Sequence, residues 1–436
     1  MAFLIYNLVL LMLSPAIALY MLYRVFVSRK SRDSWRQQLG VSGIPKSIID
    51  KPKLWIHAVS VGESVASASV IAELRSQLPD VALLISTTTS TGQEMARKSV
   101  KEADAVFYYP FDLLPCVELA LARVSPLVFA STDTEIWPNF LHAAHRRRVR
   151  TAIINGTISD KTMRGARLLP WFYRWAMRNL DRFCAQSQLD ADRAIALGAD
   201  PSRVVVTGNC KADQALCPMQ VGEIEALREL FGISCQTRVF VAGSTNPGED
   251  EPVIDAFVTA RASHPGLKLI LAPRQIERRS EIAKIVASKG LKCAWRSEPM
   301  TITGGEDVVI LDTLGELAKV YAIADVTFVG GSLIKRGCHS ILQPIAQGKP
   351  VFFGPYTFKA KDLVSQAKAA GVGFEIHDAD ELGREIARIL SAPRLLSEIA
   401  SHCERMMQAN LGASKRTAAV LVELYREAVG SNAESA

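Results

Sequence analysis

The stretch Trp55-Ile-His-Ala-Val-Ser-Val-Gly-Glu63 is an apolar run that ends in a glycine and a single carboxylate. The apolar residues that follow fall at helical spacing, at Val65, Val70, Ile71 and Leu74. The pattern predicts that a strand ends and a helix begins near Gly62. In an open α/β sheet ligands bind at such strand ends, and the free N–H groups of a helix start favour negative charge. Glu63 is therefore a candidate base for a substrate hydroxyl.

Short apolar runs alternate with helix-like segments outward from this stretch. They predict strands over residues 54–59, 81–87, 105–109, 127–131, 151–154, 182–186 and 204–207. After a segment with one helix (214–237), further strands are expected over 239–242, 267–271, 308–311, 326–329 and 350–353, and residues 381–429 are mostly helical. Strands that alternate with helices are typical of parallel, doubly wound sheets. We expect two α/β domains of similar size that face each other across a cleft.

Size and composition narrow the class of protein. A chain of 436 residues is too long for one ordinary core, so two domains and a terminal appendage are expected. The net charge of +7 suits an anionic surface or substrate but is too small to indicate nucleic acid, for which no motif is present. The eight cysteines form no Cys-x-x-Cys pair, and the seven histidines form no cluster. We therefore expect reduced thiols in the cytosol and no metal site.

The first 23 residues carry no charged side chain, and basic residues follow them at Arg24, Arg29, Lys30, Arg32 and Arg36. About 20 apolar residues suffice to cross a bilayer, and basic residues after them keep the next domain cytoplasmic. A cleaved signal peptide is disfavoured because the basic residues follow the apolar run. Residues 1–32 are predicted to anchor the chain to a membrane, either spanning it or lying in its interface; the alternative is a buried helix.

Three strand exits in the second half carry glycine or proline: residues 242–250 (AGSTNPGED), 271–274 (LAPR) and 329–344 (VGGSLIKRGCHSILQP). Bare backbone N–H groups at a helix start, together with the guanidinium of Arg274, suit a phosphate. None of the three is a Walker loop or a Gly-x-Gly-x-x-Gly fingerprint. Taken singly, such an exit is more often only a tight turn.

Polar residues also follow strands in the first half: Asp133 and Glu135 after one, Asn155 after the next and Lys211 after the last. All are predicted to lie at the same sheet edge. The alternative for the two acidic residues is helix capping. A basic, aromatic stretch over residues 164–182 suits anionic lipid headgroups, although it also fits a solvated helix face.

Taken in order, the strand exits resemble those of one known family. The motifs are WIHAVSVGE, TTTSTG, YPFDL, TEIWPN, TGNCKAD, AGSTNPGEDE, LAPRQIERR, FVGGSL and GKPVFFGPYTF. They resemble the lipid A Kdo transferases (3-deoxy-D-manno-octulosonic acid transferases) over nearly the whole chain. The resemblance implies a GT-B glycosyltransferase with two Rossmann-like domains, here 33–213 for the acceptor and 214–429 for the CMP-sugar. It also implies a CMP-Kdo donor, a lipid A precursor (lipid IVA) as acceptor, no cofactor, and an inner-membrane location with cytoplasmic catalytic domains.

The resemblance also implies roles for single residues. The general base falls on Glu63, and two transition-state stabilisers fall on Asp133, where the family usually has Glu, and on Lys211. Residues implied to bind CMP are Pro273, Arg274, Leu314, Gly315, Glu316, Ser340, Ile341, Leu342 and Gln343. The implied reaction is inverting and independent of metal.

The departures from the family pattern cluster in the donor half. The family's RGGHNPLEP reads RGCHSILQP here, so that Gln343 replaces a carboxylate, and Asn246 and Gln275 replace histidines. The loss of the carboxylate removes a charge-assisted hydrogen bond worth about 1.5–3 kcal/mol. Three alternatives therefore remain: a paralogue that transfers another CMP-linked ulosonic acid, a sugar-nucleotide epimerase or hydrolase of the same fold, and a catalytically degenerate membrane scaffold.

Overall fold

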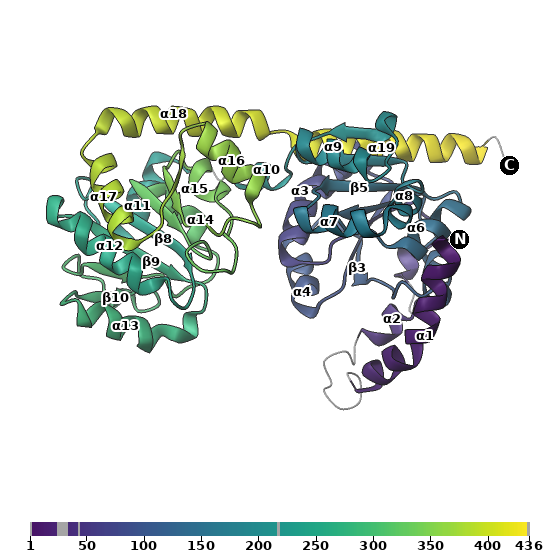
Figure 1. Cartoon of the computed structure of the whole chain (residues 1–436), viewed down its shortest axis with the longest axis horizontal. Helices are drawn as coiled ribbons and strands as arrows, with labels where there is room; N and C mark the ends of the chain where they lie inside the picture. Colours follow the sequence, from purple (N-terminus) through teal and green to yellow (C-terminus); the bar gives the residue numbers. More distant parts are fainter. Residues whose placement is uncertain (1, 24–33, 42–43, 216–218, 434–436) are drawn as a thin grey trace. The chain divides into compact units, whose positions relative to one another are not determined.

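Each of the two predicted strand series forms its own parallel sheet (Figure 1). The structure is a computed structural model of the chain and describes residues 2–23, 34–41, 44–215 and 219–433. The first compact unit comprises residues 1–214 and 411–436, and the second comprises residues 215–410. The basic residues Arg24 to Arg32, part of the predicted anchor, lie outside the described residues.

The sheet of the first unit has seven strands in the order β3-β2-β1-β4-β5-β6-β7, all parallel. They are β1 (Lys53–His57), β2 (Ala82–Thr87), β3 (Ala105–Tyr108), β4 (Val128–Thr132), β5 (Arg150–Gly156), β6 (Arg182–Ala185) and β7 (Val204–Val206). The strand order reverses between β1 and β4, which is where doubly wound sheets bind ligands. Every residue of β1 is buried, because helices cover both faces of a parallel sheet.

The helices of the first unit mostly connect successive strands. They are α1 (Ala2–Leu22), α2 (Trp35–Gln38), α3 (Val61–Gln77), α4 (Ser90–Ser99), α5 (Leu114–Val124), α6 (Pro138–Arg146), α7 (Asp160–Leu168), α8 (Pro170–Met177), α9 (Gln188–Ala196), α10 (Lys211–Ala215) and α19 (Ala413–Ala433). The predicted junction at Gly62 is confirmed, since β1 ends at His57 and α3 begins at Val61.

The second unit repeats the arrangement with the strand order β10-β11-β9-β8-β12-β13-β14, again all parallel. Its strands are β8 (Val239–Thr245), β9 (Lys268–Pro273), β10 (Cys293–Trp295), β11 (Val308–Ile310), β12 (Val326–Val329), β13 (Val351–Phe353) and β14 (Gly373–Glu375). Its helices are α11 (Val221–Leu230), α12 (Asp250–Ser263), α13 (Arg279–Ser288), α14 (Leu317–Val320), α15 (Leu342–Ala346), α16 (Lys361–Ala369), α17 (Ala379–Leu390) and α18 (Pro393–Asn410). The order reverses between β8 and β12.

The prediction of two doubly wound α/β domains is confirmed, and each predicted strand lies within a few residues of an observed one. Two strands were missed, β10 and β14, which are the outer strands of the second sheet. Both have three residues and are only partly buried, so neither carries the long apolar run that marks a central strand.

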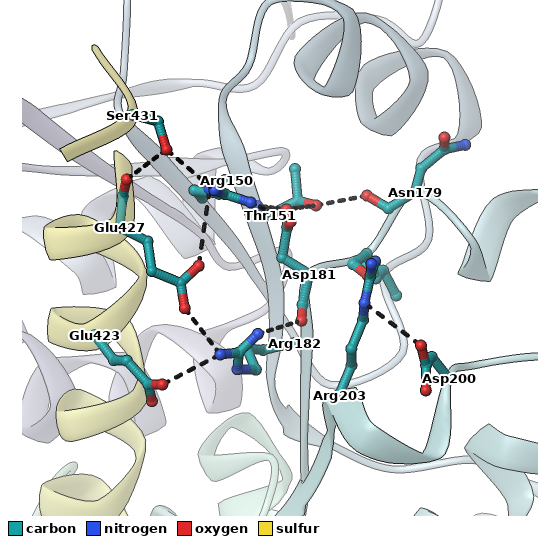
Figure 2. Close-up of polar contacts among 11 residues, drawn as sticks. Arg150, Thr151, Asn179, Asp181, Arg182, Asp200, Arg203, Glu423, Glu427 and Ser431 are labelled. Carbon is teal, nitrogen blue, oxygen red and sulfur yellow. Dashed lines mark hydrogen bonds and ion pairs between the residues drawn. The ribbon is translucent and has the colours of Figure 1, made fainter. Parts of the chain in front are cut away.

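The C-terminal helix α19 belongs to the first unit, so the predicted extent 214–429 for the second domain is wrong in its last part. Leu421 and Leu424 of α19 are fully buried in one apolar cluster with residues of β1 and α3. Figure 2 shows polar contacts between the same helix and residues of β5 and β6. There Arg182 of β6 pairs with Glu423 at 3.2 Å and with Glu427 at 3.0 Å. The helix therefore completes the core of the first unit.

The N-terminal helix α1 packs on α6 and α8 of the first unit by one side only. The ring of Tyr6 lies near Trp175, and its hydroxyl donates to Asp112 at 2.9 Å; Asn7 is hydrogen-bonded to Asn139 at 2.8 Å. Among the described residues, no helix is long and apolar enough to cross a membrane. The contacts of Tyr6 and Asn7 hold α1 on the first unit by polar interactions as well as by aromatic packing.

Candidate active site

Glu63 lies in the first turn of α3 and is 7% exposed. Its Oε2 accepts the backbone N–H of Val59 at 2.7 Å, and its Oε1 accepts the hydroxyl of Ser60 at 2.7 Å. Ser60 is also the N-cap of α3 and accepts the N–H of Glu63. This reciprocal capping explains why the sequence Ser-Val-Gly-Glu starts a helix here, and it fixes the carboxylate at the strand exit.

A second strand exit reaches the same carboxylate. The hydroxyl of Thr132, the last residue of β4, donates to Oε2 of Glu63 at 2.8 Å and also lies 3.0 Å from the carbonyl oxygen of His57 in β1. Since β1 and β4 flank the reversal of strand order, Glu63 stands at the topological switch point of the first sheet, where ligands are bound in this fold class.

Asp133 and Lys211 are joined to each other beside this point. Lys211 Nζ lies 3.6 Å from Asp133 Oδ2. Asn155 links their segments, because its Nδ2 donates to Asp133 Oδ1 at 2.7 Å and its Oδ1 accepts the N–H of Cys210 at 2.9 Å. Asp133 and Asn155 both adopt left-handed backbone angles, with φ of 55° and 51°. Such conformations concentrate at functional sites in proteins.

The carboxyl groups at this site perturb one another. Burial and the negative charge of Asp133 raise the pKa of Glu63, while the hydrogen bonds from Ser60, Val59 and Thr132 partly offset the rise. Burial and the charges of Glu63 and Asp133 raise the pKa of Glu135 to about 7. A carboxylate with a raised pKa is a stronger base and accepts a proton more readily, which suits general-base chemistry.

His57, in the same strand exit, is not a candidate base. It is fully buried and stacks on Tyr109, with 3.8 Å between the ring centroids. Burial lowers its pKa to about 3, so the ring stays neutral. Its place is in the core beneath the site.

In the second unit, Glu249 links two strand exits across the switch point. Its carboxylate is fully buried and accepts the backbone N–H groups of Gly331 at 2.6 Å, Ser332 at 3.0 Å and Leu333 at 2.9 Å. It also accepts the N–H of Asn246 at 3.0 Å. The loops after β8 and β12 are therefore held together by one carboxylate.

The third exit of the second unit joins the first through Arg274, whose backbone N–H donates to the carbonyl oxygen of Thr245 at 2.8 Å. The Arg274 side chain is exposed. Burial and the positive charges of Arg274, Lys359 and Arg336 lower the pKa of His339 to about 4. The edge of the second sheet thus gathers cations around a neutral histidine, an arrangement that suits an anionic ligand.

The other residues implied to bind CMP differ in what they can offer. Ile341 and Leu342 are buried, so only their backbone groups could meet a nucleotide, whereas Ser340 is exposed and Gln343 is half-buried. Glu316 is paired with Arg296 at 3.1 Å and accepts the hydroxyl of Thr313. Leu314 is exposed and Gly315 has a φ of 88°. Pro273 ends β9 beside Thr245.

The predicted site residues are divided between the two units. Glu63, Asp133 and Lys211 lie in the first unit and the nine CMP-binding candidates in the second. Sequence reasoning missed the roles of Thr132, Asn155 and Glu249, each of which lies in a stretch recognised as a strand exit. Among the described residues, no group of three or more His, Cys, Asp or Glu side chains is placed to hold a metal ion.

Comparison with known proteins shows the family to which the chain is similar. The family described as 3-deoxy-D-manno-octulosonic-acid transferase (kdotransferase) matches residues 33–214. A 3-deoxy-D-manno-octulosonic acid transferase of Bordetella pertussis is 31% identical over 431 residues, which cover 95% of this chain and 97% of that protein.

Two further comparisons extend the picture. A bifunctional glycosyltransferase/methyltransferase of Fusobacterium nucleatum subsp. nucleatum is 30% identical over 93% of this chain, and the match spans only 63% of that relative's length. The crystal structure of a UDP-GlcNAc 2-epimerase from Neisseria meningitidis aligns over 86% of this chain and over 100% of the epimerase chain, with a TM-score of 0.60 and 12% identity. The last likeness shows the fold alone. The full-length identity to the Bordetella protein shows that the chain belongs to the 3-deoxy-D-manno-octulosonic acid transferase family and is a glycosyltransferase.

Proposed function

We propose that the enzyme transfers Kdo from CMP-Kdo to a glucosamine hydroxyl of a lipid A precursor (lipid IVA), with inversion at the anomeric carbon. The observation that carries the proposal is Glu63, a buried carboxylate at a helix start and at the switch point of the first sheet, near Asp133 and Lys211. We assign the acceptor to the first unit and the donor to the second.

In the proposed step Glu63 acts as the general base. The acceptor O–H bond breaks as its oxygen attacks the anomeric carbon of Kdo, and the proton passes to the carboxylate. The bond from the anomeric carbon to the phosphate oxygen breaks on the opposite face, and its electron pair leaves with CMP. Lys211 and Arg274 offset the negative charge that grows on the departing phosphate. Asp133 holds Lys211 in place through its ion pair.

Incubation of the enzyme with CMP-Kdo and lipid IVA, followed by mass spectrometry of the lipid, tests the proposal. We expect the lipid to gain the mass of Kdo, and NMR of the product to show an anomeric configuration opposite to that of the donor. A lipid that gains mass only from another CMP-linked ulosonic acid would favour the divergent paralogue, which the neutral amide of Gln343 makes the second candidate. Turnover of a soluble sugar nucleotide without acceptor would favour the epimerase or hydrolase.

We further propose that α1 lies in the interface of the cell inner membrane and keeps the catalytic units on the cytoplasmic side. A helix that is apolar all round is normally buried. Here the side that carries Phe3, Tyr6 and Asn7 packs on the first unit. The other side exposes large apolar side chains at Leu4, Ile5, Leu8, Val9, Leu11, Met12, Leu13 and Leu19.

Further exposed apolar side chains lie at Leu168 and Leu169 at the end of α7 and at Trp171 in α8, the helix that α1 contacts. The arginines within residues 164–182 would meet anionic lipid headgroups. The lipid chains of the acceptor could then stay in the bilayer while its sugar reaches Glu63.

The variant L8Q/L11Q/M12Q is expected to bind anionic phospholipid vesicles at least about a hundredfold more weakly than wild type. Each large apolar side chain kept in water costs about 1.5–3 kcal/mol of insertion energy. Vesicle co-sedimentation measures the affinity. The control variant V221Q/L230Q/M300Q changes three exposed apolar residues of the second unit and should bind as wild type does. Equal loss in both variants would contradict the interfacial role of α1.

A further inference from the structure

We propose that Thr132 is a positioning residue of the general base, whose hydroxyl turns between Glu63 and the His57 carbonyl as Glu63 loses and gains the acceptor proton. The inference rests on the proposed role of Glu63 and deepens it. Thr132 Oγ1 lies 2.8 Å from Glu63 Oε2 and 3.0 Å from the carbonyl oxygen of His57. A threonine hydroxyl carries one hydrogen, so it donates fully to only one of these acceptors at a time.

The two oxygens of Glu63 are not equivalent. Among the described residues, Oε2 accepts two donors, the Val59 N–H at 2.7 Å and the Thr132 hydroxyl, whereas Oε1 accepts one, the Ser60 hydroxyl at 2.7 Å. The acceptor proton therefore enters on Oε1, which keeps a lone pair free of those donors. No other bond changes at the carboxyl group in this step, and the proton leaves to solvent after turnover.

Protonation changes which acceptor the Thr132 hydroxyl prefers. A carboxylate is a markedly stronger hydrogen-bond acceptor than a neutral carboxyl group, so the ionised base holds the hydroxyl at Oε2. After proton uptake, the carbonyl of His57 becomes the better partner. Thr132 is 1% exposed and has no access to solvent as a substitute. The pair of acceptors thus keeps a buried donor satisfied in both states of the base without any movement of the backbone.

The effect of the Thr132 hydroxyl on the pKa of Glu63 can be separated from the effects of the other groups near Glu63. Asp133 and Glu135 supply negative charge, Lys211 is paired with Asp133, and burial keeps His57 neutral. A substitution at Thr132 leaves all four in place. A change in the titration of the base after such a substitution therefore reports on the hydroxyl itself.

The test compares the pH dependence of kcat/KM in T132V and T132S with wild type. Removal of a donor to the ionised form raises the pKa of Glu63, so the acid limb of the T132V profile should move to higher pH by about one unit, with about tenfold lower kcat/KM on the acid side. T132S keeps the hydroxyl and should follow the wild-type limb. KM for CMP-Kdo should change in neither variant.

An acid limb of T132V that coincides with wild type, or one of T132S that moves as far as that of T132V, would overturn the inference. If T132V does not fold, as judged by its circular dichroism and thermal transition, T132C takes its place, since a thiol is a weak donor of similar size. The base assignment is tested separately by E63Q. Inactive E63Q with an unmoved T132V limb would reject only the role of Thr132, whereas active E63Q would reject both.

Discussion

Replacement of Glu63 with glutamine is expected to lower kcat by about 10²–10⁴-fold while CMP still binds. The amide cannot take a proton from the acceptor hydroxyl, because its nitrogen is not basic and its oxygen is a poor base. The nucleotide should be unaffected, since the proposed donor site lies in the second unit and Glu63 in the first.

The hydrogen bonds at Glu63 explain why E63Q should fold. The amide oxygen can occupy the position of Oε2 and accept from Val59 and Thr132, as the carboxylate does. The amide NH₂ then faces the Ser60 hydroxyl, which can accept a hydrogen bond as well as donate one. A loss of activity in this variant therefore reports on the proton transfer.

Mass spectrometry of the lipid product gives the rate, and calorimetric titration with CMP gives the affinity. The matched control is E94Q, at an exposed glutamate of α4 in the same unit, which should keep wild-type turnover. An E63Q enzyme that works at the wild-type rate would refute the base assignment.

Replacement of Glu249 with alanine is expected to destabilise the second unit by at least about 4 kcal/mol and to weaken CMP binding strongly. The carboxylate is fully buried and accepts four backbone N–H groups, those of Asn246, Gly331, Ser332 and Leu333. Each buried donor left without a partner costs about 1–3 kcal/mol. The loop after β12 leads to the CMP-binding candidates Ser340 to Gln343, and the loop after β8 is hydrogen-bonded to the backbone of Arg274, so donor affinity should fall with stability.

Urea unfolding gives the stability change, and hydrogen exchange of residues 331–333 shows where it arises. The three N–H groups should exchange much faster in E249A, since they lose their acceptor. The control E251A removes an exposed glutamate two residues along, which lies 3.7 Å from Lys289, and should cost less than about 1 kcal/mol. Unchanged hydrogen exchange at residues 331–333 in E249A would show that the Glu249 carboxylate does not hold these loops.

Much of the fold could be predicted because parallel strands at the centre of a sheet are marked by continuous apolar runs. β1, β4, β8 and β12 are buried on both faces and were all predicted. β10 and β14 were not, because an outer strand of three residues needs no such run. The assignment of α19 failed for another reason. Its apolar residues could serve either sheet, and sequence proximity favoured the second unit.

The candidate site was predicted as separate strand exits but not as a network. Glu63, Asp133 and Lys211 were each found by their position after a strand. The links between them depend on long-range pairing: Thr132 is 69 residues from Glu63, and Asn155 is 55 residues from Cys210. A threonine and an asparagine at strand ends carry no local sign of such partners.

The sequence by itself determined the alternation of strands and helices, the helix start near Gly62 and the family, because these depend on local periodicity, capping and ordered motifs. Only the tertiary structure decided that α19 completes the first core, that one carboxylate clamps two loops of the second unit, and that Thr132 stands between Glu63 and His57. The physical reason is that buried polar groups must find partners within reach in space, and the order of strands in the sheet determines which residues those are.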